Sequence, residues 1–351
     1  LCLLPVAFIG CYLAALLGLV WAWGGTVLAW VTAWPLRYIL AVAKVLSKLP
    51  GAVLFTGNRM VVWWLVLVYV MFGAAWLISR RRKARYWIPA ACSVLALCAV
   101  LTVNAVQLQR TSTVTALDVS QGQSIVFSSG RACAVVDCGG RSTVEDPGDL
   151  AARKLLAQGH RSLDLLVLTH PHDDHINGVL RLMHWLPVRT LVIPAAADTT
   201  KAPLSDILAL AAENHTTVVR VDAERTVTAG SISVHLYPEP CAGQEDGSMI
   251  VLTSIGDYDT LVPGDVDMTA EVKFLSDCAY PSVELLLVGH HGSKKSTSDA
   301  WLDAIAPDDA IISVGYNNYG HPTSDTLERL QAHHIPIYRT DQMGDITVHL
   351  S

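Results

Sequence analysis

Three histidines and two aspartates lie within six residues of this sequence, where HPHDDH at residues 170–175 closely follows the apolar run LLVL. The run has the length of a buried strand. Imidazole and carboxylate groups are ligands for zinc and manganese in proteins. His170 and His172 can hold one ion, and Asp174 and His175 can hold a second. A solvated loop that is rich in histidine by chance is disfavoured, because more ligand types follow other strands downstream.

Other predicted strands in the second half of the sequence are followed by the same residue types. Three more apolar runs lead to Asp265, to His290 and His291, and to His321. In layered α/β proteins, ligands collect beyond the carboxyl ends of strands. One carboxylate, here Asp265, can bridge two ions about 3.5–4 Å apart, and two ions make hydroxide available near neutral pH. Alone, Asp265 would be an ordinary Gly-Asp turn, so the argument depends on the whole set.

Charge divides the chain of 351 residues into two parts. The first 110 residues contain ten of the 25 Lys and Arg residues and none of the 31 Asp and Glu residues, and all 13 histidines follow them. The first part therefore has the composition of a membrane segment. The net charge of -6 is an average over both parts, so it does not exclude a nucleic-acid partner. The eight cysteines form no C-x-x-C pair, which argues against a thiolate zinc site or a disulfide framework.

The first part is expected to be helical and to lie in a membrane. Apolar stretches at about residues 3–23, 61–79 and 88–106 are long enough to span a bilayer. Residues 26–49 mix Trp, Tyr, Arg and Lys with apolar residues, which predicts one or two helices in the membrane interface. Because the chain begins at Leu1 with no charged segment before its apolar run, we expect it to be the C-terminal part of a larger membrane protein.

A basic loop at residues 80–85, RRRKAR, separates the last two of these stretches. Lys and Arg concentrate on the cytoplasmic side of short loops. We therefore expect residues 61–106 to form a hairpin whose tip is cytoplasmic, and the chain after residue 110 to lie outside the cell membrane. Basic residues spread over positions 37–59, on the opposite side, weaken this bias.

From residue 111 the pattern is that of a soluble α/β domain. Early strands followed by strand and helix units favour two packed sheets with helices outside, an αββα sandwich at 111–351 after an all-α membrane segment at 1–110. The predicted strands are 113–119, 124–128, 132–136, 165–168, 190–193, 217–221, 232–236, 248–253, 260–262, 283–288, 310–314 and two near the end, and the predicted helices are 147–158, 204–214 and 324–333.

The second part resembles the metallo-β-lactamase superfamily and, within it, the extracellular domain of ComEC-type competence proteins, which are inner-membrane channels for DNA uptake. The resemblance covers residues 111–350, and its last two motifs, together with the preceding membrane helices, point to the competence group. The motifs are LDV with QG at 117–122, VD with GG at 136–140, LTHPHDDH at 168–175, PGD at 263–265, VGHHGSK at 288–294, and SVG with NYGHP at 313–322.

The resemblance implies two divalent ions, Zn²⁺ or Mn²⁺. The first would be held by His170 and His172, and the second by Asp174, His175 and His290, with Asp265 bridging. Many superfamily members supply a further histidine to the first ion just before the strand that leads to the Gly-Asp turn. Here that place reads GQEDGS at 243–248, so an acidic residue, Glu245 or Asp246, substitutes or the first ion is loosely held.

The resemblance also implies catalytic roles for three residues. His291 and His321 would lie beside the substrate phosphate or donate a proton to the leaving oxygen, and Asp174 would orient the attacking water. The choice between His290 and His291 as the metal ligand stays open, because one residue of register reverses their directions.

A phosphodiester suits such a site, because two cations stabilise both the attacking and the leaving oxygen. Ser293, Lys294 and Lys295 follow the histidine pair and are candidates for substrate contact, although an ordinary solvated turn is an equal alternative for the lysines. Further cations are Arg131, Arg141, Lys273 and Arg339. This set is thin for tight duplex binding and fits weak handling of DNA that a channel delivers.

We therefore expect a multi-pass protein of the cell membrane whose extracytoplasmic two-metal domain hydrolyses DNA, degrading the strand that is not imported. The expected partners are DNA, the lipid bilayer and other components of DNA uptake. One alternative is a surface-anchored, metal-dependent phosphodiesterase or esterase that acts on envelope polymers. The other is a non-catalytic gating domain of the channel.

Overall fold

The computed structural model describes residues 3–46, 60–79, 86–108, 110–141, 145–238 and 248–350. The chain divides into two compact units, residues 1–55 and 56–351. The proposed change from a membrane segment to a soluble domain at residue 110 falls within the second unit. Helices α3 (Met60–Ser79) and α4 (Trp87–Leu108) belong to the second unit, in which β1 (Ser112–Ala116) begins shortly after α4 ends.

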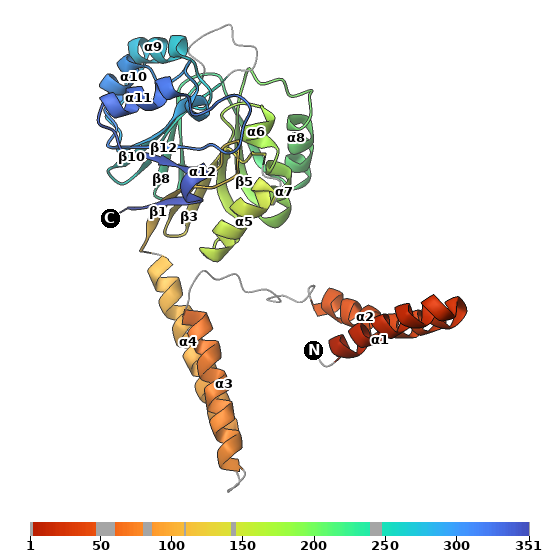
Figure 1. Cartoon of the computed structure of the whole chain (residues 1–351). Helices are drawn as coiled ribbons and strands as arrows, with labels where there is room; N and C mark the ends of the chain where they lie inside the picture. Colours follow the sequence, from red (N-terminus) through yellow and green to blue (C-terminus); the bar gives the residue numbers. More distant parts are fainter. Residues whose placement is uncertain are drawn as a thin grey trace. The chain divides into compact units, whose positions relative to one another are not determined.

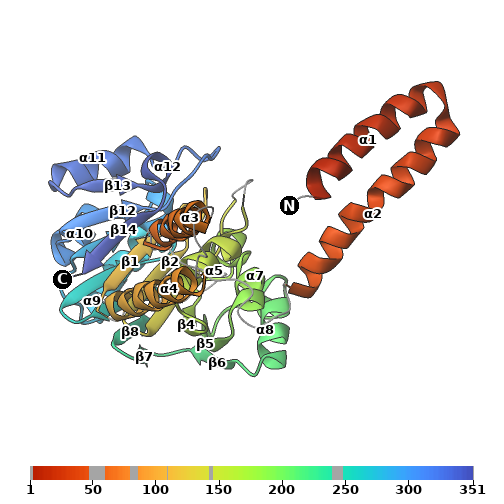
Figure 2. The same ribbon diagram turned by 90° about the horizontal axis from the view of Figure 1, so that it is seen from below.

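The first unit is a helical hairpin of α1 (Leu3–Val20) and α2 (Ala22–Leu46), which lie side by side in Figures 1 and 2. Small residues allow the close approach. A Cβ added to Gly25 would lie 2.4 Å from the Cα of Gly18, so the two backbones are in contact there. Small residues at such contacts are typical of helices that pack within a membrane.

Three described helices are long and apolar enough to cross a membrane, judged by length and composition: Ala22–Val45, Met60–Ile78 and Trp87–Leu108. Residues Ala7–Val20 form a shorter apolar helix. The stretches expected at 61–79 and 88–106 thus coincide with α3 and α4, which are joined by a hydrogen bond of 2.8 Å from Trp64 Nε1 to the Ser93 carbonyl. Residues 26–46 of the segment expected in the interface lie in α2, a helix of spanning length, and residues 47–49 lie outside the described residues. The basic loop 80–85 lies outside the described residues.

The rest of the second unit contains two seven-stranded sheets. In order across the first sheet, the strands are β14 (Ile346–Leu350), β1, β2 (Ile125–Ser129), β3 (Ala132–Val136), β4 (Leu163–Val167), β5 (Val188–Pro194) and β6 (Thr217–Val221). In order across the second, they are β13 (Ile337–Arg339), β12 (Asp309–Ile312), β11 (Leu285–Leu287), β10 (Tyr258–Val262), β9 (Ile250–Ile255), β8 (Ile232–Tyr237) and β7 (Arg225–Ala229).

Each sheet is antiparallel at one end and parallel at the other. The pairs from β14 to β3 and from β7 to β10 are antiparallel, and the pairs from β3 to β6 and from β10 to β13 are parallel. Helices cover the outer faces (Figure 1). They are α5 (Pro147–Ala157), α7 (Val179–Trp185) and α8 (Leu204–Glu213) on the first sheet, and α9 (Met268–Asp277), α10 (Asp299–Ile305) and α11 (Ser324–Ala332) on the second. The expected αββα sandwich is confirmed.

Alternation along the strands explains the layers. In β3, Cys133 and Val135 pack in the cluster that contains α5, whereas Ala134 and Val136 pack between the sheets. Successive side chains of a strand point to opposite faces, so a strand that is apolar on both faces is buried on both. The domain therefore has one core between its sheets and one under each layer of helices.

The parallel strands place the polar loops at one edge. Strands β3 and β4 are parallel neighbours, as are β10, β11 and β12. Their carboxyl ends lead to Asp137, to residues 170–175, to Asp265, to the short helix η1 (Gly289–Gly292) and to residues 313–322. The fold thus brings together segments far apart in the sequence.

Candidate metal centre

A cleft of about 440 Å³ opens at the carboxyl ends of these strands. Most of the predicted site residues line it. The lining residues are Gln121, Arg141, Pro171, His172, Asp173, Asp174, Asp265, His290, His291, Tyr319 and His321.

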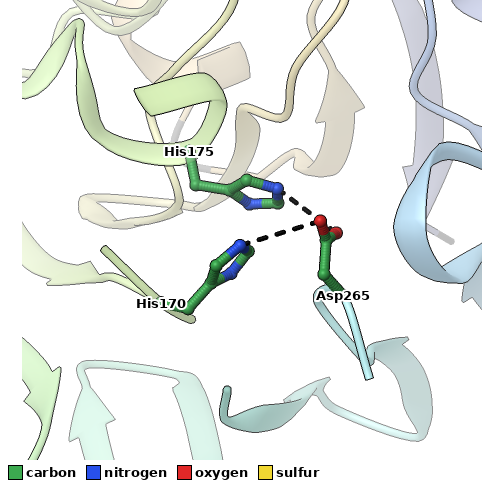
Figure 3. Close-up of side chains that lie close together, drawn as sticks. All are labelled: His170, His175 and Asp265. Carbon is green, nitrogen blue, oxygen red and sulfur yellow. Dashed lines mark ion pairs between the residues drawn. The ribbon is translucent and has the colours of Figure 1, made fainter. Parts of the chain in front are cut away.

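His170, His175 and Asp265 form one group of converging ligand atoms (Figure 3). His175 Nε2 lies 3.3 Å from Asp265 Oδ1, and His170 Nε2 lies 3.7 Å from Asp265 Oδ2. Ligand atoms that surround a tetrahedral zinc ion at about 2.0–2.1 Å are roughly 3.3 Å from one another. These separations are therefore close to those of a metal centre.

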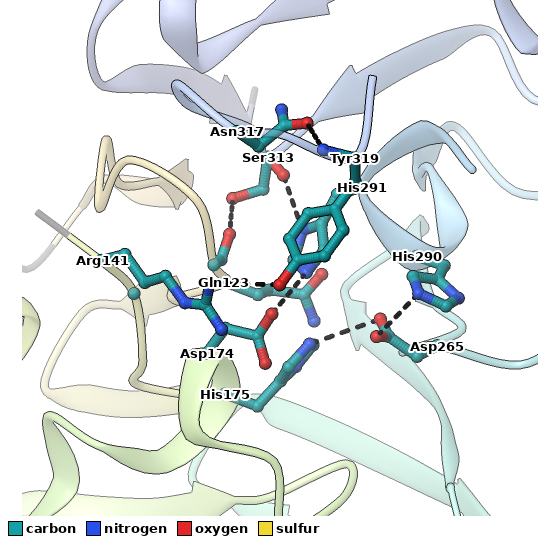
Figure 4. A network of polar contacts seen from close by, with 12 residues as sticks. Gln123, Arg141, Asp174, His175, Asp265, His290, His291, Ser313, Asn317 and Tyr319 are labelled. Carbon is teal, nitrogen blue, oxygen red and sulfur yellow. Dashed lines mark hydrogen bonds and ion pairs between the residues drawn. The ribbon is translucent and has the colours of Figure 1, made fainter. Parts of the chain in front are cut away.

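Asp174, His175 and His291 form a second group. His291 Nε2 lies 3.6 Å from Asp174 Oδ2. Asp174 and His175 both belong to one helical turn, α6 (Asp173–Ile176), which begins directly after His172. His175 is common to the two groups, so the groups are adjacent in the cleft (Figure 4).

Several ligand atoms are buried without a hydrogen-bond partner among the described residues. They are His170 Nε2, His175 Nε2, His291 Nε2 and Asp265 Oδ1. Buried polar atoms are almost always satisfied, and such a concentration of exceptions calls for a missing partner. Divalent cations would be suitable partners for all four atoms, so the residues present fit metal ions.

Hydrogen bonds fix which nitrogen of each histidine faces the cleft. His175 Nδ1 contacts Asp137 Oδ2 at 2.8 Å, and His291 Nδ1 contacts the Ser313 carbonyl at 2.8 Å. A nitrogen that donates to such an acceptor carries the proton, so Nε2 is the atom that can give a lone pair to a cation. This is the arrangement that metal-binding histidines use. Burial lowers the pKa of His175, but the Asp265 and Asp137 carboxylates raise it well above its usual value, so a cation would have to displace the proton from its Nε2.

Asp137 holds this arrangement together, and sequence reasoning assigned it no role. Its fully buried carboxylate also accepts hydrogen bonds from Gln123 Nε2 at 2.8 Å and from the backbone and hydroxyl of Thr169, each at 2.7 Å. The signal was present in the sequence, because Asp137 directly follows a buried strand within one of the quoted motifs.

The local charges suit cation binding. Burial raises the pKa of Asp265, but the imidazoles of His175, His291 and His170 together lower it to well below its usual range. Burial likewise raises the pKa of Asp174, and contact with His291 brings it far below its ordinary value. Burial lowers the pKa of His170, which favours the neutral imidazole. Ionised carboxylates and neutral imidazoles are the forms that bind metals.

The backbone turns both histidines of η1 toward the cleft. His290 and His291 have φ values of 49° and 55°, in the left-handed region that few residues other than glycine adopt. His291 is buried, whereas the His290 side chain is 39% exposed and its Nε2 lies 3.7 Å from Asp265 Oδ2. Strain of this kind is concentrated at functional sites.

The remaining predicted residues lie at different distances from the centre. His172 lines the cleft with its ring 4.6 Å from that of His170, but it belongs to neither ligand group. His321 lines the cleft with its ring 5.6 Å from that of His290. Of the candidate substrate contacts, Ser293 is buried, Lys294 and Lys295 are exposed, and none of the three lines the cleft. Glu245 and Asp246 lie outside the described residues.

The profile of the metallo-beta-lactamase superfamily matches residues 117–316. ComE operon protein 3 of Bacillus subtilis is 29% identical over 66% of this chain and 32% of its own length. Competence protein ComA of Neisseria gonorrhoeae is 30% identical over 66% of this chain and 31% of its own length. Recombination protein 2 of Haemophilus influenzae is 26% identical over 66% of this chain and 28% of its own length.

The chain belongs to the metallo-β-lactamase superfamily and has its hydrolase fold. The expected resemblance to ComEC-type competence proteins is confirmed by relatives that carry competence names. The chain spans about a third of the length of these relatives. The superfamily binds divalent metal ions, typically two, in agreement with two adjacent ligand groups.

Proposed function

We propose that this chain is a metal-dependent nuclease that hydrolyses phosphodiester bonds of DNA during DNA uptake. The observation that carries the proposal is the convergence of buried, unsatisfied ligand atoms from His170, His175, His291 and Asp265 on one cleft. Two adjacent cation sites match the demands of a phosphodiester, in which charge develops on two oxygens. The similarity to competence proteins supports DNA as the substrate.

In the proposed metal assignment, His170, His172 and Asp265 would hold the first ion, and Asp174, His175 and His291 would hold the second. His291 takes the place that sequence reasoning gave to His290. The reason is that His291 Nε2 is buried within 3.6 Å of Asp174, whereas His290 is partly exposed on the other side of Asp265. The metal is Zn²⁺ or Mn²⁺, both of which accept imidazole and carboxylate ligands.

When bound, the ions supply charge stabilisation and a hydroxide near neutral pH. Asp174, at the edge of the ligand groups, would orient the attacking water. His321 lies across the cleft and donates a proton to the leaving oxygen. His290 lies between His321 and Asp265, where it contacts the phosphate. Burial lowers the pKa of His290 and of His321, whereas the negative charge of a bound phosphate would raise the pKa of His321 and so favour the protonated ring that can donate.

The helices of spanning length bear on where in the cell this activity takes place. The described helices that are long enough to span a membrane fit a membrane protein. We propose a multi-pass chain with the basic loop 80–85 in the cytoplasm and the domain from residue 111 on the outer side. The domain would then meet incoming DNA and degrade the strand that is not imported, in company with other components of DNA uptake.

The purified chain in detergent should cut DNA in the presence of Mn²⁺ or Zn²⁺. The double variant His172→Ala with Asp174→Ala removes one ligand from each proposed site and should abolish cutting. His349→Ala, which changes an exposed histidine on β14, should cut like the natural chain. Unchanged cutting by the double variant would contradict the proposed metal ligands and the nuclease mechanism. Hydrolysis of small phosphodiesters with none of DNA would favour an envelope substrate instead.

A further inference from the structure

The loop at residues 315–322 contributes Tyr319 and His321 to the wall of the metal cleft, and it also carries Tyr316, which is not among the lining residues. Tyr316 is 89% exposed and Tyr319 is 58% exposed. Among the described residues from 110 onward, Trp185 is the other exposed large aromatic side chain, and it lies on α7. Single exposed apolar residues are common on protein surfaces, but two rings on one loop beside a reaction site form a local surface with its own chemistry.

Asn317 holds this loop in one conformation. Its Nδ2 donates to the carbonyl oxygens of Gly315 at 2.9 Å and His321 at 2.8 Å. Its Oδ1 accepts from the backbone N–H groups of Tyr319 at 3.1 Å and His321 at 3.0 Å. The two tyrosines are therefore carried by a cross-braced turn, so little conformational entropy is lost when a ligand packs on them.

Arg141 faces Tyr319 from the opposite wall (Figure 4). Its Nη1 donates to the Tyr319 hydroxyl at 3.1 Å, and its guanidinium lies 5.8 Å from the centre of the ring. A second line of rings leads inward from the same tyrosine. The Tyr319 ring is 5.9 Å from that of His321, which is 5.6 Å from that of His290. Aromatic surface thus runs from the mouth of the cleft to the metal ligands.

We propose that Tyr316, Tyr319 and Arg141 form a stacking platform for unpaired nucleobases, so that the site takes a single strand in preference to intact duplex. This inference rests on the proposed nuclease function. Bases in a duplex cover each other's faces, whereas the bases of a single strand can stack on aromatic side chains. Such stacking is combined with arginine contacts in many sites for single strands. The cation of Arg141 can also contact the backbone phosphate of the same nucleotide.

Binding in the absence of metal separates stacking from catalysis. The full chain in detergent, with EDTA present, is titrated with three labelled probes: a short oligothymidine, the same strand with abasic sites in place of the bases, and a blunt duplex. The abasic strand keeps the phosphates and loses the bases. The natural chain should bind oligothymidine about tenfold more tightly than the abasic strand, because each base that stacks on an aromatic side chain strengthens binding.

Three variants make the result specific. Tyr316→Ala with Tyr319→Ala should bind oligothymidine and the abasic strand equally weakly. Tyr316→Phe with Tyr319→Phe keeps both rings and should retain the preference for bases, although the hydroxyl contact to Arg141 is gone. Trp185→Ala, which removes the exposed aromatic ring on α7, should behave like the natural chain.

The inference is overturned if the natural chain does not distinguish the two strands, if the alanine pair keeps the distinction, or if the phenylalanine pair loses it. Hydrolysis of oligothymidine and duplex with Mn²⁺, measured in parallel, tells this failure from failure of the nuclease proposal. No hydrolysis of either DNA defeats the proposed function. Hydrolysis without any dependence on bases or tyrosines defeats the stacking platform alone.

Discussion

Which nitrogen of each histidine faces the cleft depends on acceptors behind the ligands. Asp137 is the clearest case, because it contacts no proposed ion and yet bonds to His175 and Thr169. Neighbouring loops also depend on it, since the same carboxylate accepts from Gln123. The chemistry of the centre is therefore set partly by a residue beneath it.

Asp137→Asn should weaken metal binding by about 10- to 100-fold, the usual cost of losing a carboxylate that orients a metal-binding histidine. An amide at this position can present its NH₂ group to His175 Nδ1, which would favour the tautomer with the proton on Nε2. Isothermal titration of the metal-free chain with Zn²⁺ measures the effect. Asp206→Asn, on the exposed face of α8, is the control. Equal affinities in all three proteins would show that Asp137 has only a structural role.

The six residues at 170–175 could be recognised from sequence because all the ligand types lie close together. The choice between His290 and His291 could not, since strand alternation does not apply there. Two consecutive left-handed residues turn both side chains toward the cleft, and no local sequence pattern predicts that geometry. The geometry favours His291, whose Nε2 is buried near Asp174.

At the scale of elements, the metal loop is positioned by close backbone packing. A Cβ added to Gly139, in the loop after β3, would lie 2.5 Å from the backbone nitrogen and carbonyl carbon of His175. The neighbouring residue Cys138 also donates its N–H to the His175 carbonyl at 2.8 Å. The loop that follows β3 thus packs against α6, the turn that follows β4, and fixes its position.

Gly139→Ala should push α6 away from β3 and lower both stability and metal affinity. Overpacking of this kind costs about 1–3 kcal/mol. Urea unfolding measures the stability and metal titration the affinity. Gly256→Ala is a control without a steric clash, because nothing lies within 4 Å of its added Cβ, although its positive φ adds some strain. If Gly139→Ala bound metal like the natural chain, the close approach would be irrelevant to the centre.

His160, which follows α5 and contacts β2, should make the stability of the folded domain depend on pH. It is buried, with Nε2 2.8 Å from the Ser128 hydroxyl, and burial lowers its pKa from the ordinary value of 6.5. Below pH 6.5 the unfolded chain therefore binds a proton that the folded chain does not. The contribution to stability is complete above pH 6.5 and is lost as the pH falls toward the folded pKa.

His160→Gln should consequently flatten the fall in unfolding free energy below pH 6.5. A difference of one pH unit between the pKa of His160 in the folded and unfolded chain corresponds to about 1.4 kcal/mol of unfolding free energy. Urea unfolding of both proteins at pH values on either side of 6.5 checks this. A variant that loses stability as steeply as the natural chain would place the dependence elsewhere.

Long apolar runs predicted most strands well, as with β3 and β6, whose bounds match the prediction. Sequence reasoning missed β7, the helices α7, α9 and α10, and the four-residue helical segments α6, η1 and α12 (Thr340–Met343). β7 (RTVTA) has the same length and exposure as β6 (TVVRV), but it places a single valine among threonines and a charged residue, so it showed no apolar run. The two short helices, α7 and α10, have seven residues each, too few for a helical periodicity to stand out. α9 carries a signal, an Asp267 cap, that length and apolar pattern did not reinforce.

At the scale of the whole molecule, charge separated a membrane part from an ionisable part, and the described helices agree with that division. Compactness divides the chain at residue 55, with α3 and α4 in the same unit as the two sheets, and the boundary proposed at residue 110 describes composition instead. Composition reports the surroundings of a segment, whereas its partners in the fold depend on contacts that composition does not contain. The family could be recognised from short sequence motifs. The choice of substrate could not, because it depends on side chains that only the fold brings together around the cleft.

The proposed orientation predicts which residues are accessible from each side. A cysteine introduced within residues 80–85, in a chain whose natural cysteines are replaced by serine, should react with a membrane-impermeant maleimide only after the membrane is opened. A cysteine at exposed Asp206, on α8, should react in intact cells. The reverse labelling pattern would place the metal centre in the cytoplasm and end the proposed role in handling incoming DNA.

The central claim is that bound metal makes this cleft a nuclease. Its most direct test is hydrolysis of a single-stranded oligonucleotide by the purified chain as Mn²⁺ is added back to the metal-free protein. We predict no hydrolysis without metal and a rate that rises and saturates near two ions per chain, in line with the two ligand groups. Absence of hydrolysis at every metal ratio in a folded chain, or hydrolysis unaffected by metal removal, would contradict it.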